Sequence, residues 1–296
     1  MSDSNSTHNV LCFGEVLWDR LPDGEVPGGA PMNVAYHLTQ MGCTAWLMSS
    51  VGDDALGAGL LQRLQDWGVR CDFVGIDANY PTGVVNVSVD NGSPSYDIAE
   101  DVAWDRITVP VSLITTTPSI DAVVFGSLAA RHDYNRSSLL HALEQVPSAL
   151  KVFDVNLRPP HDDYDLVWQL ARNADLVKLN DEEITAVLGG GGTTGSLEDG
   201  AREIADRAGC DRVCITAGAD GAGLLDGGNW YWSKGEKIVV GDTVGAGDAF
   251  LAALVAGLIS TPEEPESILA KASRLAGLVA SSRGATPLYD VDELVI

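Results

Sequence analysis

The 296-residue sequence has few cysteines and histidines, and it lacks a long apolar run. Without a run of about 18 apolar residues, no transmembrane helix is expected. The first nine residues are polar and lack the pattern of a secretory signal, so a cytoplasmic location and no membrane partner are expected. The five cysteines have no zinc-finger spacing, which favours reduced, buried thiols. The five histidines form no HExxH-like arrangement, so a transition-metal site lacks support.

Positive charge is also scarce, because 18 basic residues, of which five are lysine, face 42 acidic ones. The net charge of −24 disfavours nucleic acid and anionic membranes as partners. A nucleotide site on such a surface would need local positive potential from Mg²⁺, backbone N–H groups and a few basic side chains. High acid with little lysine is typical of proteins from a salty cytoplasm, although an ordinary acidic cytosolic protein fits equally well.

Two glycine motifs of nucleotide-binding proteins are absent. The glycine run at 189–192 is not followed by Gly-Lys-Ser/Thr, so it is not a Walker-type phosphate loop. No GxGxxG opens a helix after the first strand, which weakens a dinucleotide-dependent oxidoreductase as an interpretation.

Apolar, β-rich runs alternate with amphipathic helical stretches along the chain. Strands are expected over Val10–Glu15, Ala45–Val51, Ala122–Gly126, Lys151–Asn156, Leu176–Asn180, Arg212–Ala217 and Gly223–Leu225. Helical patterns between them include Pro31–Met41, Ala55–Trp67, Tyr134–Gln145 and Asp181–Leu188. Near-continuous apolar strands separated by helices predict an α/β fold with a mostly parallel sheet covered on both faces.

Two segments break this rhythm. Thr82–Asp90 alternates apolar and polar residues and then turns at Asn91 and Gly92 into Ser95–Glu100, which predicts an antiparallel hairpin. Glu15–Pro27 is short and rich in turn residues. Together they could form a small β flap that closes over a substrate, or an edge hairpin with no moving role.

The segment Asp242–Val255 (DTVGAGDAFLAALV) places small residues directly before an apolar helix. Gly245, Ala246 and Gly247 can expose N–H groups at the helix start, where the helix dipole favours anions. Asp248 falls in the first turn, where a carboxylate could simply complement the dipole. An anion cradle beside a carboxylate also suits phosphoryl transfer, which needs charge stabilisation and a proton acceptor.

A second segment, Gly28–Gly52, begins with paired glycines before a helix. Gly28 and Gly29 would let a ligand approach the backbone closely. Asn33, in the first turn, offers a donor and an acceptor that suit sugar hydroxyls. Taken alone, the segment is better explained as a tight turn and a helix in which Asn33 satisfies local backbone groups.

These two segments resemble the two signatures of the PfkB carbohydrate kinase family. The first signature is matched by Gly28, Gly29, Asn33, Gly42 and Gly52, and the second throughout Asp242–Asp248 and the small and apolar residues that follow. The resemblance implies a ribokinase-like, doubly wound, mostly parallel sheet with helices on both faces and a small β-sheet lid. It implies one kinase domain over 1–296, with the lid formed by about 15–27 and 82–106.

The resemblance also implies roles for individual residues. It makes Asp248 the catalytic base. The residues that resemble the anion hole are Gly245, Ala246 and Gly247. Those that resemble substrate contacts are Asp19, Gly28, Gly29, Asn33 and Arg158. Those that resemble ATP contacts are Asn180, Thr216, Gly218 and Gly221. Glu183 resembles a residue that helps to hold Mg²⁺ through water, and Asp242 with the carbonyl of Val244 resembles part of a monovalent-cation site.

Within the family, the sequence leans toward fructokinase. The GGAPMNVAYHL form of the first signature and the Ala103-Trp104-Asp105 element are similar to fructokinases. The DVNLRP element with Arg158 also occurs in 2-keto-3-deoxygluconate kinases, where an arginine could pair with the substrate carboxylate. Phosphorylation of D-fructose to fructose 6-phosphate is therefore the expected reaction. The keto-acid kinase is an alternative, and a non-catalytic sugar-binding regulatory protein is another.

The same resemblance predicts the small molecules and partners. ATP and Mg²⁺ are the expected cofactors, and K⁺ would occupy the monovalent-cation site. The expected ligands are a sugar and ATP, with no nucleic acid. The exposed edge of the lid would allow pairing across a homodimer.

Overall fold

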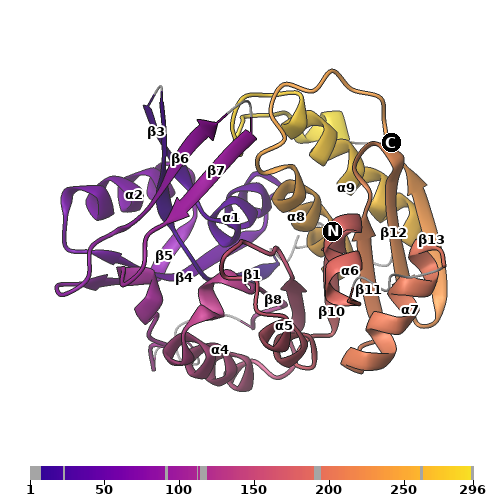
Figure 1. Cartoon of the computed structure of the whole chain (residues 1–296), viewed down its shortest axis with the longest axis horizontal. Helices are drawn as coiled ribbons and strands as arrows, with labels where there is room; N and C mark the ends of the chain where they lie inside the picture. Colours follow the sequence, from indigo (N-terminus) through magenta and orange to yellow (C-terminus); the bar gives the residue numbers. More distant parts are fainter. Residues whose placement is uncertain are drawn as a thin grey trace, which may run out of the picture.

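The computed structural model describes residues 8–22, 24–90, 93–111, 113, 119–189, 195–260 and 263–294. These residues form a nine-stranded sheet and a separate four-stranded sheet (Figure 1). In spatial order the larger sheet contains β13 (Asn229–Lys234), β12 (Gly221–Asp226), β11 (Arg212–Thr216), β10 (Leu176–Asn180), β9 (Leu150–Asp154), β8 (Ala122–Gly126), β1 (Asn9–Phe13), β4 (Thr44–Gly52) and β5 (Arg70–Asp77). Neighbours from β11 to β5 are parallel, whereas β12 and β13 pair antiparallel at one edge.

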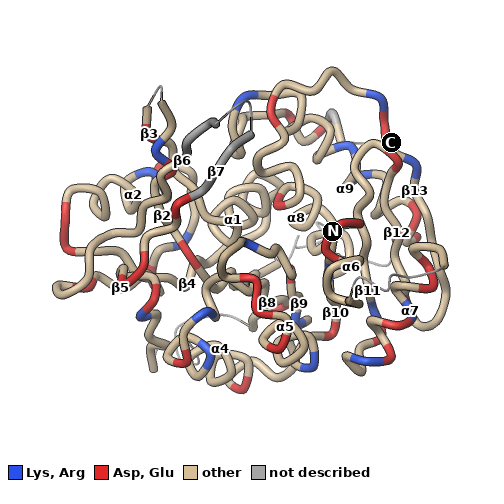
Figure 2. Tube along the Cα trace, in the orientation of Figure 1, with Lys and Arg blue, Asp and Glu red and all other residues tan. Residues whose placement is uncertain are grey.

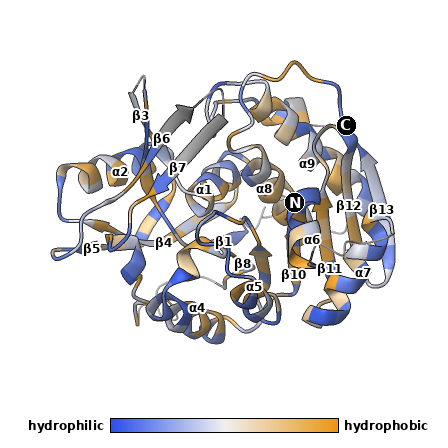
Figure 3. Ribbon diagram, viewed as in Figure 1, coloured by the Kyte–Doolittle hydropathy of each residue, from blue (hydrophilic) through white to orange (hydrophobic). Residues whose placement is uncertain are grey.

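Helices cover both faces of the larger sheet. One core cluster contains residues of α4 (Asp133–Gln145), α5 (Tyr164–Ala171), α6 (Asp181–Val187) and α7 (Leu197–Ala208). The other contains residues of α1 (Ala30–Gln40), α2 (Ala55–Asp66), α8 (Ala246–Ile259) and α9 (Pro265–Ala280). Alternate residues of β1 enter opposite clusters, which is why a strand buried on both faces is almost wholly apolar. Figure 3 shows the same apolar colouring along β10, β11 and β12.

The predicted fold class is confirmed, and the predicted strands differ from the observed ones by at most two residues at each end. The prediction omitted β5 and β13. β5 lies at the sheet edge, and most of its residues are exposed or half-buried, so it carries no apolar run. β13 lies at the other edge and is also only partly buried.

The predicted flap segments form the four-stranded sheet. Its order is β3 (Gly24–Gly28), β2 (Leu17–Leu21), β6 (Gly83–Asp90) and β7 (Ser93–Ile98), and we call it the lid sheet. It stands beside the end of the molecule that carries β4, β5 and α2 (Figure 1). The predicted turn at Asn91 and Gly92 lies outside the described residues, as do Gly190–Gly192 of the glycine run.

One part of the predicted lid is not a strand of the lid sheet. Residues Ala103–Arg106 form the short helix η1, and Trp104 within it is fully buried. Trp104 packs with Leu17, Val85 and Ile98 of the lid strands in a small core of its own. The lid sheet therefore packs against η1.

Acidic side chains are spread along the trace and are not confined to one element (Figure 2). In the part of the chain that the structure describes, no helix combines the length and the apolar character needed to cross a bilayer.

Candidate active site

Most of the predicted site residues gather at one edge of the larger sheet. Asn180 is the last residue of β10 and Thr216 the last of β11, and their Cα atoms are paired in the sheet register. Asp154 ends the next strand, β9. Because these strands are parallel, their carboxyl ends meet, which is where open α/β sheets bind ligands.

The start of α8 faces this edge with free donors. Gly245 is its N-cap, with φ of 79°, and a Cβ built there would lie 2.6 Å from Cα of Ala285. Only glycine tolerates both the conformation and the contact. Among the residues that the structure describes, no acceptor is recorded for the N–H of Gly247 or Asp248. Of the predicted donors, the N–H of Ala246 bonds to the carbonyl of Thr243 at 3.3 Å. The N–H groups of Gly247 and Asp248, at the positive end of the helix dipole, can hold an anion.

Asp248 is buried in the first turn of α8. Its Oδ2 accepts a hydrogen bond of 2.8 Å from Nδ2 of Asn33, the residue predicted from the other signature. Burial and the nearby carboxylate of Asp154 raise the pKa of Asp248, whereas Asn33 and Lys178 counteract the shift. A carboxylate with increased proton affinity, held in place by an amide, suits a general base.

Lys178 is a site residue that the sequence analysis missed. It lies within β10, opposite Asp154 in the register, and its Nζ donates to Oδ1 of Asp154 at 3.0 Å. A Cβ built on Gly247 would lie 3.4 Å from this Nζ, so the ammonium group borders the anion site. Burial opposes the charge of Lys178, but Asp154, Glu183 and Asp248 together outweigh it, and the pKa of Lys178 is raised. Of the five lysines, only Lys178 is buried.

Two of the predicted sugar contacts, Asp19 and Gly28, lie on the neighbouring lid strands β2 and β3. A Cβ built on Gly28 would fall 2.1 Å from Oδ2 of Asp19, so the glycine makes room for this carboxylate. Burial raises the pKa of Asp19 to about 6, and Arg158 opposes the shift. Arg158 also lowers the pKa of Asp248.

Glu15 is a second site residue that the sequence analysis missed. Its carboxylate is buried, and Oε1 accepts a hydrogen bond of 3.2 Å from the backbone N–H of Ala30, at the start of α1. Next to it, Gly29 has φ of 116°, and a Cβ there would lie 2.4 Å from the carbonyl oxygen of Glu15. Burial raises the pKa of Glu15 to about 7, and Asp248 contributes to the rise. Glu15 thus fixes the paired-glycine turn.

The Asn180 and Glu183 pair forms a capping box at the start of α6. Asn180 Oδ1 accepts from the N–H of Glu183 at 2.7 Å, and Glu183 Oε2 accepts from the N–H of Asn180 at 2.9 Å. Glu183 Oε1 accepts from the N–H of Leu157 at 2.8 Å. Each oxygen still has a second lone pair, so the carboxylate can also accept a metal-bound water.

Other predicted nucleotide and cation residues lie in turns. Gly218 and Gly221 bound the turn between β11 and β12, with φ of 49° and 123°. Asp242 Oδ1 accepts from the N–H of Val244 at 3.0 Å, and Oδ2 accepts from Gly284 at 3.2 Å. Among the described residues, no recorded hydrogen bond joins Asp242 to Asp248 or Asn33.

Comparison with known proteins identifies the family. The model of the pfkB family of carbohydrate kinases matches residues 22–291. The chain belongs to this family. A Klebsiella pneumoniae fructokinase is 29% identical over 96% of this chain and 97% of its own. A sugar kinase of Pyrococcus horikoshii is 29% identical over 97% of this chain and 94% of its own.

Solved structures agree with this assignment. The Pyrococcus horikoshii sugar kinase in complex with ATP has a TM-score of 0.79 at 27% identity, covering 96% of each chain. A Vibrio cholerae fructokinase with fructose, ADP and potassium bound has a TM-score of 0.82 at 26% identity, also covering 96% of each chain. The chain is therefore a PfkB carbohydrate kinase with the ribokinase-like fold.

In this PfkB kinase the two signatures meet at one point, the hydrogen bond between Asn33 and Asp248. Lys178 and Glu15 carried no signal by themselves in the sequence. A lysine among apolar strand residues gains meaning only when the register places it beside Asp154. Glu15 is one of many acidic residues until the fold buries it.

Proposed function

We propose that this kinase transfers the γ-phosphoryl group of ATP to the primary hydroxyl of a neutral sugar, with D-fructose as the substrate and fructose 6-phosphate as the product. The observation that carries the proposal is the buried Asp248, bonded to Asn33 and adjoining the free donors of α8. A base and an anion site within one helical turn supply what phosphoryl transfer requires.

In the proposed reaction, the sugar lies between the lid sheet and the larger sheet. It is held there by Asp19, Gly28, Gly29 and Asn33. Asp248 accepts the proton as the hydroxyl oxygen bonds to the γ-phosphorus and the bond to ADP breaks. The N–H groups of Gly247 and Asp248, in the turn that begins at Gly245, and the ammonium of Lys178 stabilise the charge on the transferred group. ATP lies along the strand ends, near Asn180, Thr216, Gly218 and Gly221.

The charge around Arg158 favours a neutral sugar. Arg158 is the basic residue that lowers the pKa of Glu15, of Asp19 and of Asp248. A substrate carboxylate would add a further negative charge where three carboxylates already outnumber one guanidinium. The Klebsiella and Vibrio relatives named fructokinases are consistent with this choice.

The alternative substrate is 2-keto-3-deoxygluconate. The observation in its favour is that the Arg158 side chain is exposed and, among the residues that the structure describes, donates only to its neighbouring carbonyl, that of Leu157, at 2.9 Å. The guanidinium could therefore turn to pair with a carboxylate.

We propose Mg²⁺ and K⁺ as the metal ions. Glu183 would hold Mg²⁺ through water. The buried Oδ2 of Asp154, which has no hydrogen-bond partner among the described residues, is a second acceptor at the same edge. When bound, Mg²⁺ would neutralise phosphate charge. Asp242 and the carbonyl of Val244 would contribute to the K⁺ site, in keeping with the potassium in the Vibrio structure.

The remaining proposals concern the whole chain. Residues 1–296 would act as one kinase domain, in which the lid sheet closes over the sugar and excludes water. The exposed lid edge would pair with a second copy, and the enzyme would work in the cytoplasm.

The test is an ADP-release assay with Mg-ATP and D-fructose, 2-keto-3-deoxygluconate or ribose, at low and high KCl. Turnover with fructose and not with the keto-acid is the expected result. Turnover with the keto-acid alone would reassign Arg158 to carboxylate binding and overturn the proposed substrate.

A further inference from the structure

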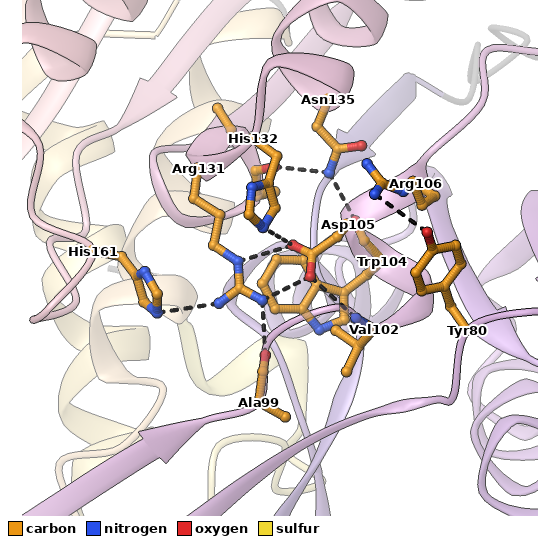
Figure 4. Close-up of polar contacts among 12 residues, drawn as sticks. Tyr80, Ala99, Val102, Trp104, Asp105, Arg106, Arg131, His132, Asn135 and His161 are labelled. Carbon is orange, nitrogen blue, oxygen red and sulfur yellow. Dashed lines mark hydrogen bonds and ion pairs between the residues drawn. The ribbon is translucent and has the colours of Figure 1, made fainter.

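Arg131 occupies the centre of a buried polar cluster outside the site (Figure 4). It is the last residue of η2 (Leu128–Arg131), and its side chain is 4% exposed. Nε and Nη2 donate to Oδ1 and Oδ2 of Asp105, both at 2.8 Å. Nη2 also donates to the carbonyl of Ala99 at 2.7 Å. Nη1 lies 3.2 Å from Nε2 of His161.

These bonds join three parts of the fold that are distant in sequence. Ala99 directly follows β7, and its N–H bonds to Val84 O at 3.1 Å, so it continues the lid pairing. Asp105 belongs to η1, against which the lid sheet packs. His161 lies beyond β9, in the segment 155–163, and its N–H bonds to the carbonyl of Arg158 at 2.8 Å.

Trp104 connects the cluster to the lid sheet. The Arg131 guanidinium lies over its ring, 4.1 Å from the centroid. A Cβ on Gly83 of β6 would lie 2.3 Å from Nε1 of the same ring, so the lid strand packs directly on it. A substitution of Arg131 would therefore alter the packing of the lid sheet as well as that of the segment 155–163.

We infer that Arg131 is a positioning residue that fixes the Arg158-bearing segment and the lid sheet relative to each other, acting on the first through His161. The reason is connectivity: Arg131 contacts the end of a lid strand on one side and His161 on the other. Arg158, three residues from His161, lowers the pKa of Asp19 in the lid sheet and that of Asp248. The inference rests on sugar phosphorylation, but not on which sugar is used.

The bond to His161 has a defined direction. A guanidinium has no acceptor, so Nε2 of His161 must accept and the ring must be neutral, with its proton on Nδ1. Burial and Arg131 lower the pKa of His161, which keeps it neutral, whereas Glu100 and Asp105 oppose the shift and His132 reinforces it. Glutamine can replace the acceptor, and leucine cannot.

The test compares His161→Leu with His161→Gln in the full-length enzyme. His161 is only half-buried, so both variants should fold. Loss of a hydrogen bond from a charged donor should raise the KM for the sugar about tenfold in His161→Leu, with an unchanged KM for ATP. His161→Gln should restore the wild-type KM. The matched control is His141→Leu, an exposed histidine on α4, which should change neither KM.

Hydrogen–deuterium exchange gives a readout that is independent of activity. His161→Leu should accelerate exchange in 155–163 only, whereas Arg131→Lys should accelerate it there and in 97–101. Unchanged exchange, or a His161→Gln variant as impaired as His161→Leu, would overturn the inference. Absence of sugar phosphorylation by the wild type would contradict the proposed function, while the exchange experiment would still test this inference.

Discussion

Lys178 and Asp154 form a buried ion pair in the middle of the sheet, with side chains 7% and 5% exposed. A buried ion pair is seldom a gain in stability over apolar residues, because both charges lose their hydration. Its presence beside Gly247 is better explained by the need for positive charge at the anion site of an acidic protein. Substitutions of this pair should then affect stability and activity differently.

Lys178→Met alone should destabilise the protein by about 3–5 kcal/mol, because the Asp154 carboxylate is left buried and unpaired. The double variant Lys178→Met/Asp154→Asn should regain most of this free energy of unfolding. Its kcat should remain about 10²–10³-fold below wild type, since the phosphoryl charge is no longer compensated and the proposed Mg²⁺ acceptor at Asp154 is altered. Urea unfolding and ADP-release kinetics measure the two effects.

Lys271→Met is the matched control, because Lys271 is a partly exposed lysine paired with Glu263. It should change the free energy of unfolding by less than about 1 kcal/mol and leave kcat unchanged. Recovery of wild-type kcat in the double variant would mean that Lys178 has only a structural role.

At the scale of elements, α1 anchors the segment that supports the anion site. His37 of α1 is buried, with Nε2 2.9 Å from the carbonyl of Ala285 and Nδ1 3.1 Å from the hydroxyl of Tyr289. Ala285 in turn packs against Gly245, the N-cap of α8. Burial lowers the pKa of His37 to about 4 from an ordinary value of 6.5.

This pKa predicts a pH dependence of stability. Between pH 6.5 and 4 the unfolded chain binds a proton at His37 and the folded chain does not, so stability falls as the pH falls through this window. The loss should approach an order of 3 kcal/mol near pH 4. His37→Gln should unfold with a shallower dependence across the same window. Equal slopes for the two proteins would contradict the neutral, buried His37.

Comparing the predicted elements with the observed ones shows which parts of the fold the sequence determines clearly. β8 and β10 were predicted with their observed bounds, because strands buried on both faces are continuous apolar runs. The lid strands followed from alternation and turn residues. The prediction could not place Trp104 beneath the lid sheet, because a short helix between two sheets has no periodic pattern. Nor could it pair Asp154 with Lys178, since that depends on the register of two strands.

At the scale of the whole molecule, the net charge of −24 is the dominant feature. Self-repulsion among carboxylates destabilises the compact state at low ionic strength, and salt shortens the screening length from about 10 Å at 0.1 M to about 3 Å at 1 M. We therefore expect the Tm to rise by at least about 2 °C between low and molar KCl. Choline chloride should have the same effect, which separates screening from K⁺ binding. An unchanged Tm would contradict adaptation to a salty cytoplasm.

The lid edge supports a prediction about assembly. An exposed edge strand presents unpaired backbone groups that favour pairing with another chain. Light scattering after size exclusion should therefore give twice the 31.2 kDa mass of the chain at working concentration. A single monomer peak would contradict pairing through the lid.

The most direct test of the account is the turnover of Asp248→Asn with Mg-ATP and the sugar that the wild type uses best. The amide oxygen can still accept from Asn33, so thermal stability should not fall. The kcat should drop by about 10²–10⁴-fold, the usual contribution of a general base. A folded Asp248→Asn enzyme with near wild-type turnover would contradict the role of Asp248 and, with it, the proposed mechanism.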